Sequence, residues 1–268
     1  MMDKEIFELS KDIFLDSADA KSYIQIESIA IQYKSLLEAI TKPLKMILIY
    51  GRPGTGKSML LSKLYADISS KQDIFLYTTP IIDEEEFFST LGDDILHLKT
   101  KNFTQFVAIL KNADFSSPPL VLLDEAQLYS DSLMEKIRLL SDTRKIKFII
   151  TLHKTQEEDL IAKEHFQTRI WESIELVSAT KEELKLYIVK KLIKENCYDN
   201  ANMFDDKAIK TIHKITKGNY RDTNKLLYTI FELYLAYDEL NMLHKVDTTK
   251  VSTKLIEMAA LQRGLLDG

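Results

Sequence analysis

The residues with the clearest chemical meaning lie in the stretch GRPGTGKS, residues 51–58, which has the spacing G-x-x-x-x-G-K-[ST]. Glycines allow a backbone to curl so that its N–H groups face a phosphate, and the start of a following helix adds positive potential. Lys57 would neutralise the β- and γ-phosphates of a nucleotide, and the Ser58 hydroxyl would ligate Mg²⁺. The alternative is an ordinary glycine-rich turn. Three of the seven glycines in the chain fall within six residues here, which favours the phosphate loop.

This phosphate loop predicts a set of nucleotide-binding residues that runs from its first glycine into the first turn of the next helix. The set is Gly51, Arg52, Pro53, Gly54, Thr55, Gly56, Lys57, Ser58 and Met59.

A second stretch, PLVLLDEAQ (119–127), ends an apolar run with two adjacent carboxylates. Ligands of a parallel sheet bind at the carboxyl ends of its strands. Asp124 would hold Mg²⁺, directly or through water, and Glu125 would polarise the attacking water. Adjacent side chains of a strand point in opposite directions, so the two carboxylates would take different roles. A lone Asp-Glu pair is common, but the phosphate loop earlier in the chain makes this pair informative.

The elements that must position these residues are short apolar runs that alternate with helical patterns. The runs are residues 46–50, 74–79, 120–125, 147–152 and 174–177. Continuous apolar strands separated by helices are typical of a parallel sheet that is covered on both faces. We therefore expect an α/β fold of the P-loop NTPase kind, with a parallel sheet flanked by helices.

The pattern changes after Ser178, and no proline follows Pro119. Thr180 and Glu183 have the spacing of a capping box, which marks the start of a helix. Further helical patterns follow at about residues 205–216, 221–237 and 248–262. We expect an α/β nucleotide-binding domain over 1–177 and an all-helical lid domain over 178–268.

Composition places the chain among soluble, globular proteins and favours the cytoplasm. The net charge is −5, with −7 over 1–177 and +2 over 178–268, so neither part is a basic nucleic-acid platform, although a local basic stripe stays open. The start lacks the long apolar run of a signal peptide, and we find no run long enough to span a membrane. A single cysteine, Cys197, suits a reducing compartment.

A phosphate loop followed by an apolar run and Asp-Glu resembles the AAA+ class of ATPases. The order of later segments narrows the resemblance, which covers about residues 7–240. This order is similar to that of the ATPases of the general secretion pathway protein A type. The segments that carry the resemblance are MEKIRLLSDTRKIKFIITLHK, FQTRI, ELVSATKEELKLYIVKKL and KGNYRDTNKLLYTIF. Those ATPases are related to others that act in transposition and at DNA origins. The opening FELSKDIFLD and the tetrapeptide DEAQ fit the same group.

The resemblance also implies roles for residues outside the two motifs. His153, with Thr151 as the alternative, would sense the γ-phosphate at the end of the fourth strand. Arg169 would reach a γ-phosphate bound by a neighbouring subunit and act in catalysis with Glu125 and Lys57. Arg221, at the start of a lid helix, would contact the phosphates of its own subunit. The alternatives are an ordinary strand-end polar group, a surface salt bridge and a solvated arginine, respectively.

These observations predict a Mg²⁺-dependent enzyme that hydrolyses ATP to ADP and phosphate and forms a nucleotide-dependent homo-oligomer. The resemblance implies a cytoplasmic motor or switch for assembly of a secretion, pilus or DNA-uptake system. The alternative is a DNA-associated ATPase that positions or loads a partner protein on DNA. The fuller secretion relatives continue into a membrane span and a cell-wall-binding region that this sequence lacks, so an envelope role would need a protein partner. The net charge does not indicate DNA.

Overall fold

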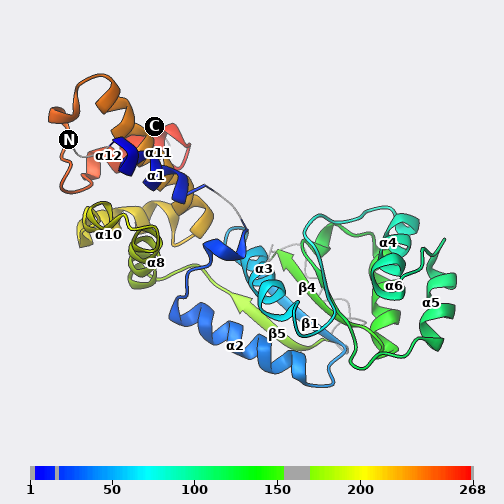
Figure 1. The fold of residues 1–268 in the computed structure, drawn as a ribbon. Coiled ribbons are helices and arrows are strands. Elements are labelled where there is room, and N and C mark those ends of the chain that lie inside the picture. The colour runs from blue at the N-terminus through cyan, green and yellow to red at the C-terminus, as the bar shows by residue number, and fades with distance from the viewer. Residues whose placement is uncertain (1–3, 16–17, 154–169, 267–268) are drawn as a thin grey trace. The chain divides into compact units, whose positions relative to one another are not determined.

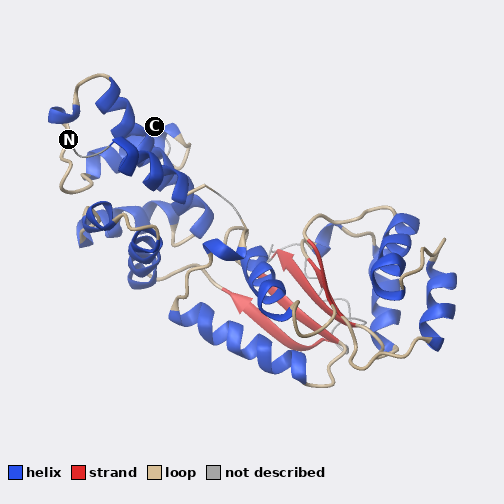
Figure 2. Ribbon diagram, in the orientation of Figure 1, coloured by secondary structure: helices blue, strands red, loops and turns tan. Residues whose placement is uncertain are grey.

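This computed structural model describes residues 4–15, 18–153 and 170–266. Contacts divide the chain into two compact units (Figure 1). The sheet unit is Ile31–Leu176, and the helical unit combines Met1–Ala30 with Val177–Gly268. Within the described residues all the strands belong to the sheet unit (Figure 2).

The sheet unit is built on five parallel strands in the order β2-β3-β4-β1-β5. The strands are β1 (Met46–Gly51), β2 (Ile74–Tyr77), β3 (Leu120–Leu123), β4 (Lys147–His153) and β5 (Ile170–Leu176). The predicted parallel α/β sheet is confirmed. The order places the carboxyl ends of β3, β4 and β1 next to one another, which is where the two motifs end.

Both faces of the sheet are covered, which explains why its strands read as unbroken apolar runs. Met46 and Leu48 of β1 belong to a buried cluster with Phe87, Phe88 and other residues of the helices on one face. Successive side chains of a strand alternate, so Ile47 and Ile49, also fully buried, face the other layer. The helix α3 packs against β1 and β2 there.

Three helices of the sheet unit, α4, α5 and α6, begin after a residue whose side chain caps them. The helices are α2 (Glu27–Thr41), α3 (Lys57–Ile68), α4 (Glu84–Leu96), α5 (Phe103–Asn112), the short 3-10 helix η2 (Ala126–Leu128) and α6 (Asp131–Asp142). Asp83 accepts a hydrogen bond from the Glu86 N–H at 2.8 Å, as the spacing of the two acids predicts. Asn102 and Ser130 cap α5 and α6 in the same way.

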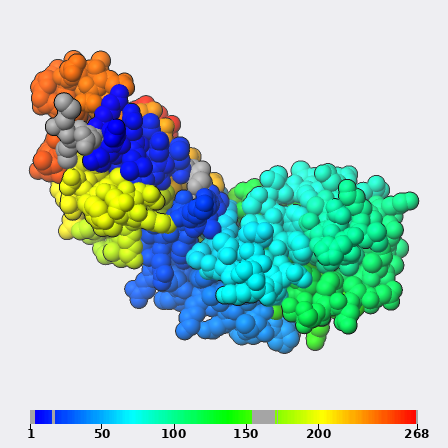
Figure 3. Space-filling view, viewed as in Figure 1, coloured from blue at the N-terminus to red at the C-terminus, as the bar shows by residue number. Residues whose placement is uncertain are grey.

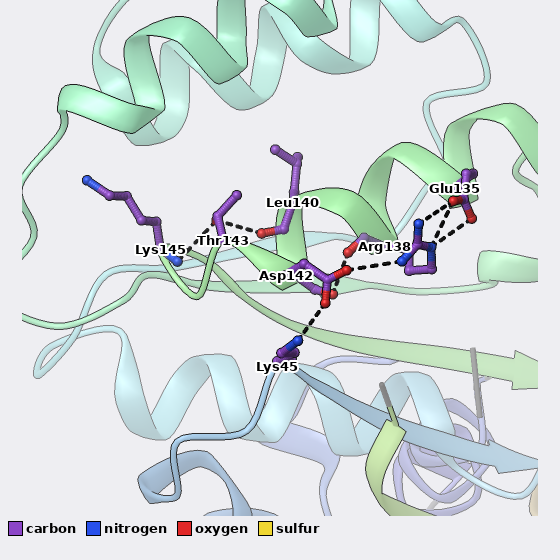
Figure 4. Close-up of polar contacts among 8 residues, drawn as sticks. Lys45, Glu135, Arg138, Leu140, Asp142, Thr143 and Lys145 are labelled. Atoms are coloured by element: carbon purple, nitrogen blue, oxygen red, sulfur yellow. Dashed lines mark hydrogen bonds and ion pairs between the residues drawn. The ribbon is translucent and has the colours of Figure 1, made fainter. Parts of the chain in front are cut away.

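The amino edge of the sheet is held by a chain of opposite charges (Figure 4). Lys45, just before β1, donates to Asp142 at 2.6 Å, and Asp142 also accepts from Arg138 at 3.0 Å. Arg138 in turn donates to both oxygens of Glu135. These bonds, led by the one to Glu135, raise the pKa of Arg138. The end of α6 is thereby fixed to the start of β1.

The helical unit contains α1 (Lys4–Ile13) and the helices after β5. These are α8 (Lys181–Lys194), α9 (Tyr198–Asn202), α10 (Asp206–Thr216), α11 (Tyr220–Glu239) and α12 (Thr253–Gln262), with short 3-10 helices η1 (Ala20–Ser22) and η4 (Leu243–Lys245). The capping box predicted at α8 is present. Thr180 Oγ1 accepts from the Glu183 N–H at 3.2 Å, and a Glu183 carboxylate oxygen accepts from the Thr180 N–H at 2.9 Å.

The first helix belongs to the helical unit and packs against α11. In Figure 3 its dark blue surface lies beside the yellow and orange surfaces of the later helices. Phe7 stacks on Tyr234 with ring centroids 5.1 Å apart, and Phe14 stacks on Phe231 at 6.0 Å. The contact-based units therefore differ from the expected division at residue 177, because the first 30 residues group with the later helices. Among the described helices, none has the length and apolar character needed to cross a membrane.

Candidate active site

The loop between β1 and α3 has the geometry that the GRPGTGKS spacing predicts. Gly54 and Gly56 have φ angles of 79° and 97°, in the left-handed region that glycine adopts without a steric penalty. Helix α3 begins directly at Lys57, with Gly56 as its N-cap residue. The N–H groups of the first turn are therefore directed toward the loop, as in an anion site at a helix start.

Gly51, the last residue of β1, is required for a different reason. A Cβ atom added here would lie 2.3 Å from the backbone oxygen of Leu176 and 2.9 Å from Thr55 Oγ1. The end of β5 thus passes so close to the loop that no side chain fits.

Lys57 is the buried cation of this loop, with only 4% of its surface exposed. Its Nζ donates to the backbone oxygens of Gly51 at 2.9 Å and Arg52 at 3.1 Å. Thr55 Oγ1 also donates to Arg52 O, at 2.9 Å. An ammonium group has three donors and a full charge, so it can bond loop carbonyls and a phosphate oxygen from the same position.

The two adjacent carboxylates at the end of β3 occupy different environments. Asp124 is 4% exposed, and its Oδ1 accepts from the Thr151 hydroxyl and, at 3.0 Å, from the Glu125 N–H. Glu125 has a φ of 50°, in the left-handed region, and its side chain is 38% exposed. One carboxylate is fixed in the interior and the other is half-open to solvent, which matches a metal ligand and a group that handles water.

Thr151 and His153, the two alternatives for the phosphate sensor, make different contacts. Thr151 is fully buried, and its Oγ1 donates to Asp124 and accepts from the Glu125 N–H at 3.0 Å. His153 is in register with Gly51 on the neighbouring strand, and its Nε2 lies 3.7 Å from Glu125 Oε1. Thr151 therefore holds the carboxylate pair, while His153 ends β4 beside the start of the phosphate loop.

Gln127 fixes the ring of His153, a role that the sequence did not single out. Its Oε1 accepts from the His153 backbone N–H at 3.3 Å, and its Nε2 lies 3.3 Å from Nδ1 of the ring. A backbone N–H can only donate, so the amide oxygen must face it and the amide nitrogen must face the ring. Nδ1 then accepts, and the ring proton lies on Nε2, toward Glu125.

The donors suit Mg²⁺, which binds through one or two protein oxygens and completes its shell with water and substrate phosphates. Asp124 and Ser58 are oxygen ligands of that kind. Among the described residues there is no group of three or more His, Cys, Asp or Glu that could enclose a metal by itself.

Comparison with known proteins agrees with this geometry. Residues 41–160 match the family described as AAA domain. This AAA match begins before β1 and includes the phosphate loop, Asp124, Glu125 and His153.

The AAA match is accompanied by a distant relative. The chain is 25% identical over 204 residues to the chromosomal replication initiator protein DnaA of Helicobacter hepaticus. The similarity covers 74% of this chain and 41% of that protein, so the chain spans about two fifths of the length of its relative.

Solved structures share the fold of the AAA match and of the helices beyond it. Cdc6p from Pyrobaculum aerophilum has a TM-score of 0.68 at 14% identity, covering 94% of this chain and 70% of that one. RuvB from Thermotoga maritima, described as a Holliday junction branch migration motor, has a TM-score of 0.58 at 18% identity, covering 93% and 73%. At these identities the likeness concerns the fold alone.

The contacts of this cluster do not test the other predicted residues. Arg169 lies outside the described residues. Arg221 is exposed in the first turn of α11, in the helical unit, so its expected contact with phosphates stays a prediction. Arg52 and Pro53 lie exposed on the loop, and Met59 belongs to the first turn of α3.

A buried tyrosine closes the segment that carries the carboxylates. Tyr129 follows η2 and packs edge-on against Phe87, with ring centroids 5.8 Å apart. Burial raises the pKa of Tyr129 to about 12, so the phenol is neutral at pH 7. It anchors the turn after Asp124 and Glu125 through packing rather than charge.

Proposed function

We propose that this chain is an AAA+ ATPase that binds ATP with Mg²⁺ at residues 51–58 and hydrolyses it. The observation that carries the proposal is the strand order β3-β4-β1, which gathers Asp124, Glu125 and His153 beside the strand that leads into the phosphate loop. The AAA match over residues 41–160 supports the same conclusion.

Each residue of the site has one task in this proposal. The N–H groups of the loop and Lys57 bind the β- and γ-phosphates. Ser58 and Asp124 would hold Mg²⁺, which supplies a positive charge that stabilises the charge of the transferring phosphoryl group. Glu125 accepts a hydrogen bond from the attacking water and orients it in line with the γ-phosphate. His153, at the end of β4, contacts Glu125 and responds to the γ-phosphate.

Two arginines would complete the site, one acting on a neighbouring subunit and one belonging to the helical unit. We propose that Arg169 reaches the γ-phosphate of a neighbouring subunit, so that hydrolysis requires a homo-oligomer. We propose that Arg221 contacts the phosphates of its own subunit. Each would supply a fixed counter-charge to the transition state. A strictly monomeric protein in the presence of a non-hydrolysable ATP analogue would contradict the role of Arg169.

The relatives favour a DNA-associated role for the ATPase cycle. They include a chromosomal replication initiator protein, a Holliday junction branch migration motor and a Drosophila ORC structure bound to DNA. We infer that the cycle positions or moves a partner on DNA. The secretion, pilus or DNA-uptake role has no comparable support and stays a prediction.

The nucleotide proposal is tested by replacing Lys57 with methionine. The Lys57→Met variant loses the ammonium that bonds phosphate, so its affinity for a fluorescent ATP analogue should fall at least tenfold and hydrolysis should cease. Lys63→Met is the matched control. Lys63 lies on the same helix, but its Nζ bonds Asp67 at 2.6 Å. Equal ATP affinity in the parent and in Lys57→Met would overturn the proposal.

The DNA-associated role is tested by ATP turnover with and without duplex DNA at two salt concentrations. Stimulation that fades as salt rises indicates contact with the phosphate backbone. Turnover that duplex DNA leaves unchanged at both concentrations would contradict the DNA-associated role and leave the ATPase assignment intact.

A further inference from the structure

Helix α10 has two chemically opposite faces. Its inner face carries Ala208, Ile209 and Ile212, all buried, and the helix packs against α8, α11 and α12. Its outer side carries four lysines, which we call the lysine face: Lys207, Lys210, Lys214 and Lys217. All four are exposed.

The spacing of these lysines puts them in one row. Steps of three, four and three residues keep side chains on the same side of a helix. Lys207, Lys210 and Lys214 lie on α10 itself, and Lys217 follows as its C-cap residue. At a rise of 1.5 Å per residue the row is about 15 Å long. It is therefore a continuous positive strip, with charges separated by about one turn of helix.

Within the described part of the chain, these four ammonium groups form no ion pair. The acids at the start of the helix are already engaged. Asp206 binds Lys185 at 2.7 Å, and Asp205 accepts from the Ala208 N–H at 2.8 Å as the N-cap residue. Residues 207–225 contain six basic residues and one acidic residue, Asp222. The helical unit as a whole holds 18 basic and 20 acidic residues, so the positive charge is local.

Such a row of like charges costs free energy that a helix face with alternating charges would avoid. Like charges three or four residues apart destabilise a helix by about 0.2–0.5 kcal/mol per pair. Helix α6 shows the usual arrangement, because Arg138 lies between Glu135 and Asp142 along the helix and binds both. The lysine face has no such alternation. A partner that brings closely spaced negative charges would turn the repulsion into binding energy.

We propose that the lysine face of α10 binds the phosphate backbone of duplex DNA. The inference rests on the DNA-associated role proposed above and assigns that contact to one helix. Lysine ammonium groups are flexible point charges suited to phosphate, whereas bidentate base readout generally uses arginine or amides. The contact should therefore be independent of DNA sequence and strongly dependent on salt.

The test compares three forms of the full chain with a fluorescent duplex of about 30 base pairs, by anisotropy between about 50 and 200 mM salt. One variant combines K207Q, K210Q, K214Q and K217N, in which asparagine suits the left-handed backbone of residue 217. The matched control, K71Q/K99Q/K101Q/K111Q, removes the same charge from exposed lysines of the sheet unit. Basal ATP turnover and the thermal midpoint are measured for all three.

The α10 variant should bind DNA at least tenfold more weakly, and the slope of log affinity against log salt should shrink by up to about 3.6, or 0.9 for each phosphate that a lysine no longer neutralises. The control should bind like the parent. Basal turnover should not change, because none of these residues belongs to the proposed nucleotide site.

Three outcomes would overturn the proposal, and each is distinguishable from failure of the proposed function. Equal binding by the parent and the α10 variant would move the DNA contact elsewhere. An equal loss of DNA affinity in the control would mean that net charge, and not the lysine face, determines binding. Tighter binding of poly-L-glutamate than of DNA by the parent would indicate an acidic protein partner instead. Absence of DNA binding by the parent would instead reject the DNA-associated role, and only absence of ATP turnover in the parent would reject the ATPase.

Discussion

Charged side chains at the two edges of the sheet have different kinds of partner. At the amino edge, Lys45, Asp142, Arg138 and Glu135 bind one another as ion pairs (Figure 4). At the carboxyl edge, Lys57 donates to backbone carbonyls. Asp124 there accepts from a hydroxyl and a backbone amide.

The difference indicates which edge is built for exchange. Breaking an ion pair to admit a ligand strands a charge, which is costly away from water. Exchanging a neutral partner for a phosphate or a metal strands none. Changes at the carboxyl edge should therefore alter rate more than stability, and changes at the amino edge should do the reverse.

The strongest test of this contrast is Glu125→Gln. Loss of the base should lower kcat by about 10²–10⁴-fold while binding of ATP persists. The thermal midpoint should stay near that of the parent, since Glu125 is half-exposed. Phosphate release and binding of a fluorescent ATP analogue measure the two effects, with Glu135→Gln as the amino-edge control. A turnover rate within threefold of the parent would remove Glu125 from the mechanism.

Gly51→Ala should be an exception to this contrast, because it should lower both stability and nucleotide binding. The added methyl would lie 2.3 Å from Leu176 O, so β5 and the phosphate loop must separate. Overpacking of this kind costs about 1–3 kcal/mol of unfolding free energy. The free energy of unfolding, measured with urea, and the affinity for an ATP analogue should both fall. Unchanged values would mean that the loop and β5 are not in close contact in solution.

At the amino edge, Asp142→Ala should lower stability and spare catalysis. It removes the shared partner of Lys45 and Arg138, at a cost of about 1–2 kcal/mol. Urea unfolding measures the loss, and kcat is determined well below the unfolding midpoint. Glu38→Ala is the comparison, because its 3.9 Å pair with Lys34 is largely exposed and should contribute under about 0.5 kcal/mol. A fall in kcat for Asp142→Ala would erase the contrast.

The smallest effect is expected for Gln127→Leu, which sharpens the picture of the carboxyl edge. Without the amide, the His153 ring can rotate and exchange tautomers, and its proton no longer faces Glu125 reliably. One lost hydrogen bond of about 0.5–1.5 kcal/mol corresponds to a two- to tenfold lower kcat, with KM unchanged. Gln72→Leu, which removes a bond to Pro118 O, is the control. A change in KM alone would argue against a positioning role.

Local pattern was enough to predict the sheet, and it also predicted the loop and the strand end on which the candidate site residues lie. The spacing of residues 51–58 constrains a loop and a helix start, and the apolar run before Asp124 predicts a buried strand. The expected strand at 174–177 instead begins at Ile170, and the helix α5 was not foreseen. The early start of β5 depends on its pairing with Met46 and Ile47 of β1, which are distant in sequence. Helix α5 carries a local signal, because Asn102 caps it.

Tertiary contacts explain what the sequence could not reveal. The stacking of Phe7 on Tyr234 joins residues more than 200 positions apart, and no periodicity within α1 indicates it. The contacts of Gln127 likewise depend on the register between β3 and β4, which sets residues of the two strand ends beside each other. The tetrapeptide DEAQ contained the residue, but its role required the fold.

The left-handed backbone of Glu125 makes this position a test of whether stability or activity determines the residue found there. A non-glycine residue at a φ of 50° is strained by roughly 1 kcal/mol, and glycine would relieve that strain. A library screened for heat resistance alone should therefore enrich Glu125→Gly, whereas a library screened for growth or turnover should exclude it. Opposite enrichment at one codon would identify a residue retained for activity at the expense of robustness.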